Sequence, residues 1–117
     1  MADPLAMQTS TSAMETKIFI QARMSSSRFP GKVLAPVNGI PMISRVVSSL
    51  TRIFDKDRII IATSDELSDD PLALYGKTLG VKIFRGPLDN VYYRFKLCLK
   101  SNPCDWFFRI CADSPLL

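Results

Sequence analysis

Short apolar runs alternate with longer amphipathic segments along this chain, and this alternation limits the folds that it can adopt. Four runs rich in Ile, Phe and Val predict strands over 17–22, 58–64, 81–84 and 104–111. Segments with apolar residues at three- and four-residue steps predict helices over 41–54, 69–80 and 88–101. Because strands that alternate with helices form parallel sheets through right-handed crossovers, we predict an α/β fold with helices on the faces of the sheet.

Proline, glycine and acidic residues mark the expected ends of these helices. Pro41 and Pro71 suit first helical turns, and Gly80 suits a helix stop. Gly76 lies inside the second helix and is expected to weaken it by about 1 kcal/mol relative to Ala. Four acidic residues precede or begin helices and are explained most simply as helix caps: Asp65, Asp69, Asp70 and Asp89.

The composition is that of one ordinary globular domain, with 117 residues, of which 47% are hydrophobic and 22% are charged. Residues 1–15 are small and polar without any period, so they predict a flexible tail that leaves 16–117 as the folded part. No apolar run approaches the roughly 20 residues that span a bilayer, and no secretory signal opens the chain. The sequence therefore predicts a cytoplasmic protein without a membrane partner.

The positive charge of the chain is concentrated in one place. Fifteen Lys and Arg residues against eleven Asp and Glu residues give a net charge of +4. Residues 22–33 hold three cations and no anion, whereas elsewhere the two signs are mixed. A protein that binds nucleic acid usually spreads basic residues over a face with exposed aromatic residues among them. The pattern therefore argues against a nucleic-acid partner and favours a small polyanion held at one site.

Histidine is absent from the sequence, which excludes Ser-His-Asp and Cys-His nucleophiles and histidine-based metal sites within this chain. The three cysteines are odd in number and never spaced as C-x-x-C, namely Cys98, Cys104 and Cys111. They predict small hydrophobic side chains in a helix and a strand, rather than a zinc site or a disulfide framework.

A basic loop follows the first predicted strand, in the stretch IFIQARMSSSRFPGK of residues 18–32. Arg23, Arg28 and Lys32 alternate there with small residues, among them Ser25–Ser27 and Gly31. A triphosphate needs several cations and backbone N–H groups in a small volume, on a backbone of small residues. The loop therefore predicts an anion site, although a solvated basic turn is the simpler alternative.

The chain resembles the sugar cytidylyltransferases at its opening, IFIQARMSSSRFPGKVLAPVNGIPMISRVV. These include a spore-coat polysaccharide type and relatives that activate acylneuraminate and 3-deoxy-manno-octulosonate. In that wider nucleotidyltransferase family the loop takes the form A-R-x-x-S-x-R-x-P-x-K, matched here by Ala22, Arg23, Ser26, Arg28, Pro30 and Lys32. The likeness continues over residues 17–117 through IIIATSDELSDDPL, GVKIFRGPLDNVYYRF and FFRICADSPL. It implies a Rossmann-like parallel sheet of the nucleotide-diphospho-sugar transferase type, truncated after about four strands.

By this resemblance the opening loop wraps the triphosphate of a nucleotide. Arg23, Arg28 and Lys32 would hold the β- and γ-phosphates and steady the pyrophosphate leaving group, so we take them as catalytic residues. Ser26 would bind the nucleotide from the same loop. The backbone at Ala22 and Arg23 would lie near the base.

The resemblance also assigns residues at the ends of the other three strands. Thr63 and Ser64 would flank the nucleotide, although helix capping explains them equally well. Arg85 and Gly86 belong to a segment whose backbone contacts the base, and Arg85 either reaches phosphate or is simply exposed. Asp113 matches the family's Asp that binds the Mg²⁺ bridging the phosphates, and a strand-end carboxylate suits Mg²⁺. The simpler alternative for Asp113 is an Asp that starts a turn.

The implied reaction is an in-line attack on the α-phosphorus of CTP by a hydroxyl of a sugar or keto-sugar acid, for surface polysaccharide biosynthesis. Because family members are considerably longer, we expect this chain to be the nucleotide-binding part, with weak nucleotide binding, little turnover and a tendency to form a homodimer. Two alternatives stay open. One is a nucleotidyltransferase for another base, and the other is a non-catalytic α/β module that binds a phosphorylated ligand or a protein.

Overall fold

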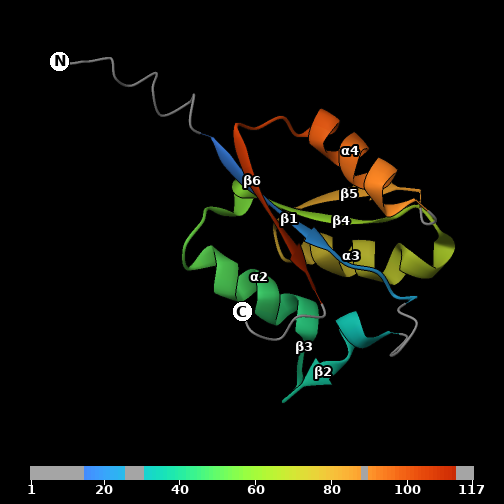
Figure 1. The fold of residues 1–117 in the computed structure, drawn as a ribbon. Coiled ribbons are helices and arrows are strands. Elements are labelled where there is room, and N and C mark those ends of the chain that lie inside the picture. Colours follow the sequence, from blue (N-terminus) through green and yellow to red (C-terminus); the bar gives the residue numbers. More distant parts are fainter. Residues whose placement is uncertain (1–14, 26–30, 88–89, 113–117) are drawn as a thin grey trace.

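Four parallel strands form the central sheet of the computed structural model, which describes residues 15–25, 31–87 and 90–112. The strands are β1 (Thr16–Gln21), β4 (Ile59–Ser64), β5 (Lys82–Gly86) and β6 (Trp106–Cys111). Their order in the sheet is β5-β4-β1-β6, and every neighbouring pair is parallel (Figure 1). The predicted α/β fold with a parallel sheet is confirmed.

Three helices cover the two faces of this sheet, namely α2 (Met42–Thr51), α3 (Asp70–Thr78) and α4 (Val91–Ser101). Buried residues of α2 and α3 share one apolar cluster with Ile18 and Ile61 of the inner strands. Phe95 and Cys98 of α4 share a second cluster with Phe19 on the opposite face. Because successive strand residues point to opposite faces and both faces are covered, the centres of β1 and β4 are apolar, and every residue of β4 is buried.

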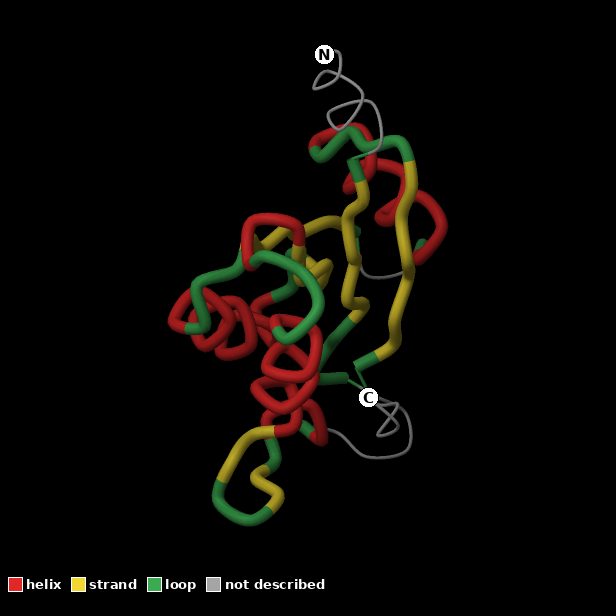
Figure 2. The backbone as a smooth tube through the Cα atoms, turned by 90° about the vertical axis from the view of Figure 1, so that its left-hand side faces the viewer, coloured by secondary structure: helices red, strands yellow, loops and turns green. Residues whose placement is uncertain are grey.

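A small hairpin that the sequence analysis did not predict precedes α2. It consists of β2 (Pro36–Val37) and β3 (Ile40–Pro41), and it projects away from the sheet in both Figure 1 and Figure 2. Its turn is formed by Asn38 and Gly39, whose φ angles are 53° and 81°, as a two-residue hairpin turn requires. Pro41 therefore ends a strand and lies just before α2, so its predicted place in the first helical turn is wrong.

Three short 3₁₀ helices complete the described elements, namely η1 (Lys32–Leu34), η2 (Lys56–Arg58) and η3 (Leu67–Asp69). Two predicted helix signals are confirmed, since Pro71 lies in the first turn of α3 and Gly80 follows that helix with a φ of 81°. The predicted cap of α4 is wrong, because the cap is Asn90, whose side chain accepts the N–H of Tyr93 at 2.9 Å. Asp89 itself lies outside the described residues.

Gly76 lets α3 lie close to the sheet. A Cβ atom at this position would be 2.6 Å from Cδ1 of Ile83 and 3.1 Å from Cδ1 of Ile61. Gly76, which the sequence predicts only to weaken the helix, thus has a packing role against β4 and β5.

The chain enters β1 directly from Glu15. The carbonyl oxygen of Glu15 accepts the N–H of Trp106 at 3.1 Å, and its own N–H donates to the Asp105 carboxylate at 3.0 Å. The remaining residues of the predicted tail, 1–14, lie outside the described part of the chain. Within the described ranges, no helix combines the length and hydropathy that a membrane crossing requires.

Candidate functional site

The candidate site lies where the four strands end, because parallel strands bring their carboxyl ends to one edge of the sheet. Hydrogen bonds join the residues at these ends. The N–H of Ala22 donates to Ala62 at 3.1 Å, the N–H of Ala112 to Gln21 at 2.9 Å, and the N–H of Asp65 to Gly86 at 2.8 Å. Ala22, Thr63, Ser64 and Gly86, all predicted site residues, therefore lie along this edge.

The opening loop leaves the sheet after Ala22, and at Gly31 the chain is again beside the first residues of the loop. The N–H of Gly31 donates to the carbonyl oxygen of Met24 at 2.7 Å, and Gly31 has a φ of 79°, which favours glycine. Arg23 and Lys32 each lie next to one of these two bonded residues, so both cations extend from the neck of the loop. Arg23 is exposed and Lys32 half-buried. Two other predicted site residues of this loop, Ser26 and Arg28, lie outside the described residues.

Asp69 joins the neck of the loop to the end of β4. One carboxylate oxygen accepts the N–H of Met24 at 2.6 Å, and the other accepts the hydroxyl of Ser64. The Ser64 oxygen in turn accepts the N–H of Glu66 at 3.2 Å. Asp69 directly precedes α3 but makes no side-chain hydrogen bond to that helix, so its predicted capping role is wrong.

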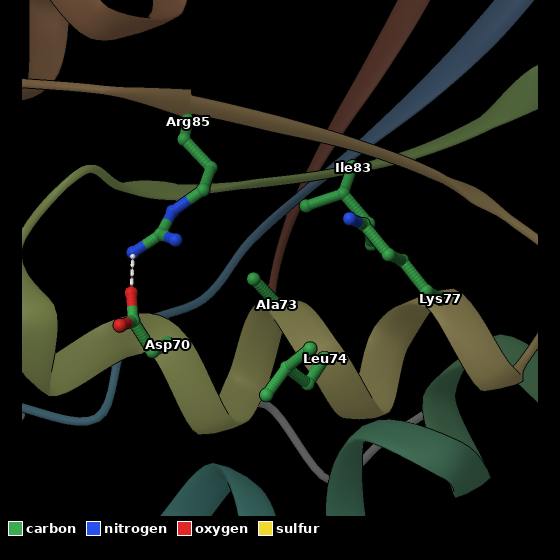
Figure 3. A pocket seen from close by; sticks show the side chains of 6 residues that line it. All are labelled: Asp70, Ala73, Leu74, Lys77, Ile83 and Arg85. Carbon is green, nitrogen blue, oxygen red and sulfur yellow. Dashed lines mark ion pairs between the residues drawn. The ribbon is translucent and has the colours of Figure 1, made fainter.

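Arg85 is bound to the connection between β4 and α3. Its guanidinium donates to the carbonyl oxygens of Ser64 and Glu66, both at 2.8 Å, and forms an ion pair with Asp70 at 2.8 Å. The predicted cap Asp70 is thus an ion-pair partner that begins α3. The pair lies at one end of a cavity of about 380 Å³ between α3 and β5, as Figure 3 shows.

Arg94 is a charged residue of this edge that the sequence analysis missed. It extends from α4, is buried, and donates to the carbonyl oxygen of Pro87 at 3.1 Å. Burial lowers its pKa and so does the charge of Arg23, while Asp69 and Asp65 act in the opposite direction. The charge of Arg94 therefore interacts with that of Arg23 at the start of the opening loop. Helical spacing could have indicated this burial, since Arg94 precedes Phe95 and lies four residues before Cys98 on the buried face.

Gly86 makes room for this arginine. A Cβ atom at Gly86 would lie 2.8 Å from Cγ of Arg94 and 3.1 Å from a ring carbon of Phe84. The predicted site residue Gly86 thus has a steric role in the described structure, because a side chain there would displace Arg94.

No group of three acidic, cysteine or histidine residues able to hold a metal occurs within 15–25, 31–87 and 90–112. The predicted metal ligand, Asp113, lies outside these ranges. Ala112, the residue before it, is hydrogen-bonded to Gln21 at the end of β1, beside the start of the opening loop. Thr63 has a buried hydroxyl with no hydrogen-bond partner among the described residues.

Comparisons with known proteins agree with one another. The chain is 35% identical over 102 residues to the spore coat polysaccharide biosynthesis protein SpsF of Bacillus subtilis. The aligned region covers 84% of this chain and 42% of that protein. A solved cytidylyltransferase from Leptospira borgpetersenii superposes with a TM-score of 0.83 at 30% identity, over 89% of this chain and 44% of that one.

A second solved structure is that of a CMP:2-keto-3-deoxy-manno-octonic acid synthetase complexed with CTP. It superposes with a TM-score of 0.72 at 25% identity and covers 88% of this chain and 42% of that one. The chain thus spans less than half the length of these relatives. A family model described as Cytidylyltransferase matches residues 18–117, and the chain belongs to that family.

Proposed function

We propose that this chain is the nucleotide-binding part of an enzyme that transfers the cytidylyl group of CTP to a sugar or sugar acid for surface polysaccharide biosynthesis. The observation that carries the proposal is the neck of the basic loop. Arg23 and Lys32 are the chain neighbours of Met24 and Gly31, which are hydrogen-bonded to each other, at the edge of the sheet where α/β proteins bind ligands. The CTP complex of one similar protein supports the choice of nucleotide.

In the proposed complex the opening loop holds the triphosphate. Arg23, Arg28 and Lys32 bind the β- and γ-phosphates, with Ser26 in the same loop, and they offset the charge that pyrophosphate carries as it leaves. The base lies against the backbone of Ala22 and Arg23.

Residues at the ends of β4 and β5 complete the proposed nucleotide site. Thr63 and Ser64 flank the nucleotide. The buried hydroxyl of Thr63 has no hydrogen-bond partner among the described residues, so it could bond to the ligand. Gly86 presents backbone to the base. Arg85, bound to Ser64, Glu66 and Asp70, acts in this proposal by fixing the β4–α3 connection beside the nucleotide.

Asp113 is the proposed Mg²⁺ ligand. A carboxylate is the donor that Mg²⁺ prefers, and the preceding residue, Ala112, is bonded to the strand from which the phosphate loop departs. When bound there, Mg²⁺ would supply positive charge to the phosphate oxygens. The chain's own contribution to the in-line displacement is positioning and charge neutralisation, since phosphoryl transfer leaves little covalent work to the protein.

Calorimetry of the 117-residue chain with CTP, in the presence and absence of Mg²⁺, tests this proposal. We expect binding that strengthens with Mg²⁺ and is tighter for CTP than for UTP, GTP or ATP. Arg23→Ala should weaken CTP binding about tenfold, because a charge-assisted contact to phosphate is lost. Arg52→Ala is the matched control, since Arg52 directly follows α2, before the turn that leads to the opposite end of β4.

A pyrophosphate-release assay with a panel of sugars and keto-sugar acids tests the transfer step. We expect little turnover from this chain by itself, because it spans less than half of its relatives. A chain that binds phosphorylated ligands without preference for CTP or response to Mg²⁺ would contradict the proposal and favour the non-catalytic binding module.

The free thiols bear on the compartment. Cys98, Cys104 and Cys111 are unpaired, and Cys111 is exposed. An exposed unpaired cysteine suits a reducing compartment, so we place the proposed reaction in the cytoplasm.

A further inference from the structure

Asp69 is a buried carboxylate for which the proposed reaction has no use. It is fully buried, whereas aspartates in globular proteins are almost never buried unless their charge is compensated by partners. Burying a carboxylate costs free energy unless hydrogen bonds compensate it. The hydrogen-bond partners of Asp69 therefore indicate which parts of the chain it holds together.

The two oxygens of Asp69 connect two different strand ends. One accepts the N–H of Met24, three residues after β1, at 2.6 Å, and the other accepts the hydroxyl of Ser64, the last residue of β4. An ionised carboxylate is an acceptor only, and both of its partners here are donors. Asp69 therefore joins β4 to the start of the opening loop.

Met24 is bonded on both sides. Its N–H donates to Asp69, and its carbonyl oxygen accepts the N–H of Gly31, which precedes Lys32. Its side chain also packs against the apolar cluster under α2. The position of the loop neck thus depends on Met24, and the polar part of that anchoring comes from Asp69.

We propose that Asp69 is a positioning residue that fixes Met24, and through it Arg23 and Lys32, against the end of β4. The effect on triphosphate binding rests on the proposed function, whereas the anchoring of the loop does not. The neighbouring Asp70 has no part in it, because its carboxylate pairs with Arg85 on the side of the cavity between α3 and β5 (Figure 3).

Hydrogen exchange of the Met24 amide tests the anchor without any nucleotide. In Asp69→Ala we expect Met24 to exchange at least about tenfold faster than in the unaltered chain, because its acceptor is gone and the loop neck opens more often. Exchange at Ile20 in the centre of β1 should change much less, which separates local loosening from global destabilisation. Asp70→Ala is the matched control and should leave Met24 unchanged.

A second variant keeps the test decisive if Asp69→Ala does not fold. In Asp69→Asn the amide oxygen can still accept the N–H of Met24 and the amide nitrogen can donate to Ser64. The amide oxygen is a weaker acceptor than a carboxylate oxygen, so we expect Met24 exchange to increase less than in Asp69→Ala, by about threefold. Met24 exchange that is unchanged in Asp69→Asn, or that rises only in step with Ile20, would overturn the anchor.

Binding measurements then test the consequence for the ligand. Asp69→Ala should weaken binding of CTP and of pyrophosphate about tenfold, and that of CMP less than about threefold, because CMP lacks the phosphates that the loop holds. Equal losses for CTP and CMP, or unchanged CTP binding, would refute the positioning role. If the unaltered chain bound no CTP, the proposed function would fail, while the exchange experiment would still decide the anchor.

Discussion

Arg94 and Cys98 lie one helical turn apart on the buried face of α4, and burial shifts the pKa of both. It lowers the pKa of Arg94, and it raises the pKa of the Cys98 thiol to about 12, against an opposing hydrogen bond from Asn102. In both cases the low-polarity environment favours the neutral form. For Cys98 the consequence is a dependence of stability on pH that a single substitution can isolate.

We predict that Cys98 makes the chain less stable as the pH rises above 9. Below that pH the thiol is protonated in both the folded and the unfolded chain, so its contribution is constant. Between the ordinary value of 9.0 and about 12, the unfolded chain releases a proton that the folded chain retains. The free energy of unfolding therefore falls, by up to about 1.4 kcal/mol per pH unit.

Urea unfolding at pH 8, 9, 10 and 11 measures this effect. Cys98→Ala should remove the part of the slope that belongs to the thiol, whereas Cys111→Ala, which alters an exposed thiol, should keep it. Identical slopes in the two variants would contradict the prediction.

At the scale of the elements, apolar patterning in the sequence predicted the four strands of the central sheet and the three α-helices that the structure describes. It could not predict the β2–β3 hairpin or the 3₁₀ helices, because two or three residues hold no period. The pair Asn38–Gly39 nevertheless carried a hairpin signal. Boundaries shifted by a few residues, as in β5, which runs to Gly86 and so reaches the candidate site.

Sequence reasoning was weakest where a polar side chain could serve either its own helix or a distant partner. Asp69 and Asp70 fit a capping pattern, yet Asp69 accepts the N–H of Met24 and Asp70 pairs with Arg85, which local sequence cannot reveal. By contrast, the location of Ala22 and Ser64 at strand ends could be predicted, because the alternation of strands and helices already implied a parallel sheet. Arg94 was missed because an arginine in a helix is ordinarily expected to reach solvent.

We predict that Gly76→Ala destabilises the chain, although Ala is the better helix former by about 1 kcal/mol. The added methyl group would lie 2.6 Å from Cδ1 of Ile83 in β5, so α3 or Ile83 must move. We expect a net loss of about 1 kcal/mol in thermal or urea unfolding, because overpacking outweighs helix propensity.

Ile83→Val removes the methyl group that the new Cβ would meet and therefore tests the cause. In that background Gly76→Ala should cost less than it does alone, which a double-mutant cycle measures as a coupling free energy. A cost that stays the same in the Ile83→Val background would show that contact with Ile83 is not the reason for the glycine.

At the scale of the whole molecule, the sheet is covered unevenly. The inner strands β1 and β4 are buried, whereas β6 pairs with β1 on one side and has no second partner among the described strands. It exposes Trp106, Phe107 and Phe108, at 62%, 45% and 55%, although Phe107 also packs edge-to-face against Phe19 and Phe95. An edge strand with unpaired backbone groups and exposed aromatic side chains is a ready template for association with another chain.

We therefore predict that the 117-residue chain self-associates through β6 at micromolar to millimolar concentration. Sedimentation velocity over a concentration series should show a shift from monomer to dimer. Trp106→Lys should weaken that shift by at least about tenfold, because a charge on an edge strand opposes strand pairing. Tyr92→Lys is the matched control, since Tyr92 is 77% exposed but lies on α4. A monomer at every concentration, or an equal effect of both variants, would show that the β6 edge does not drive association.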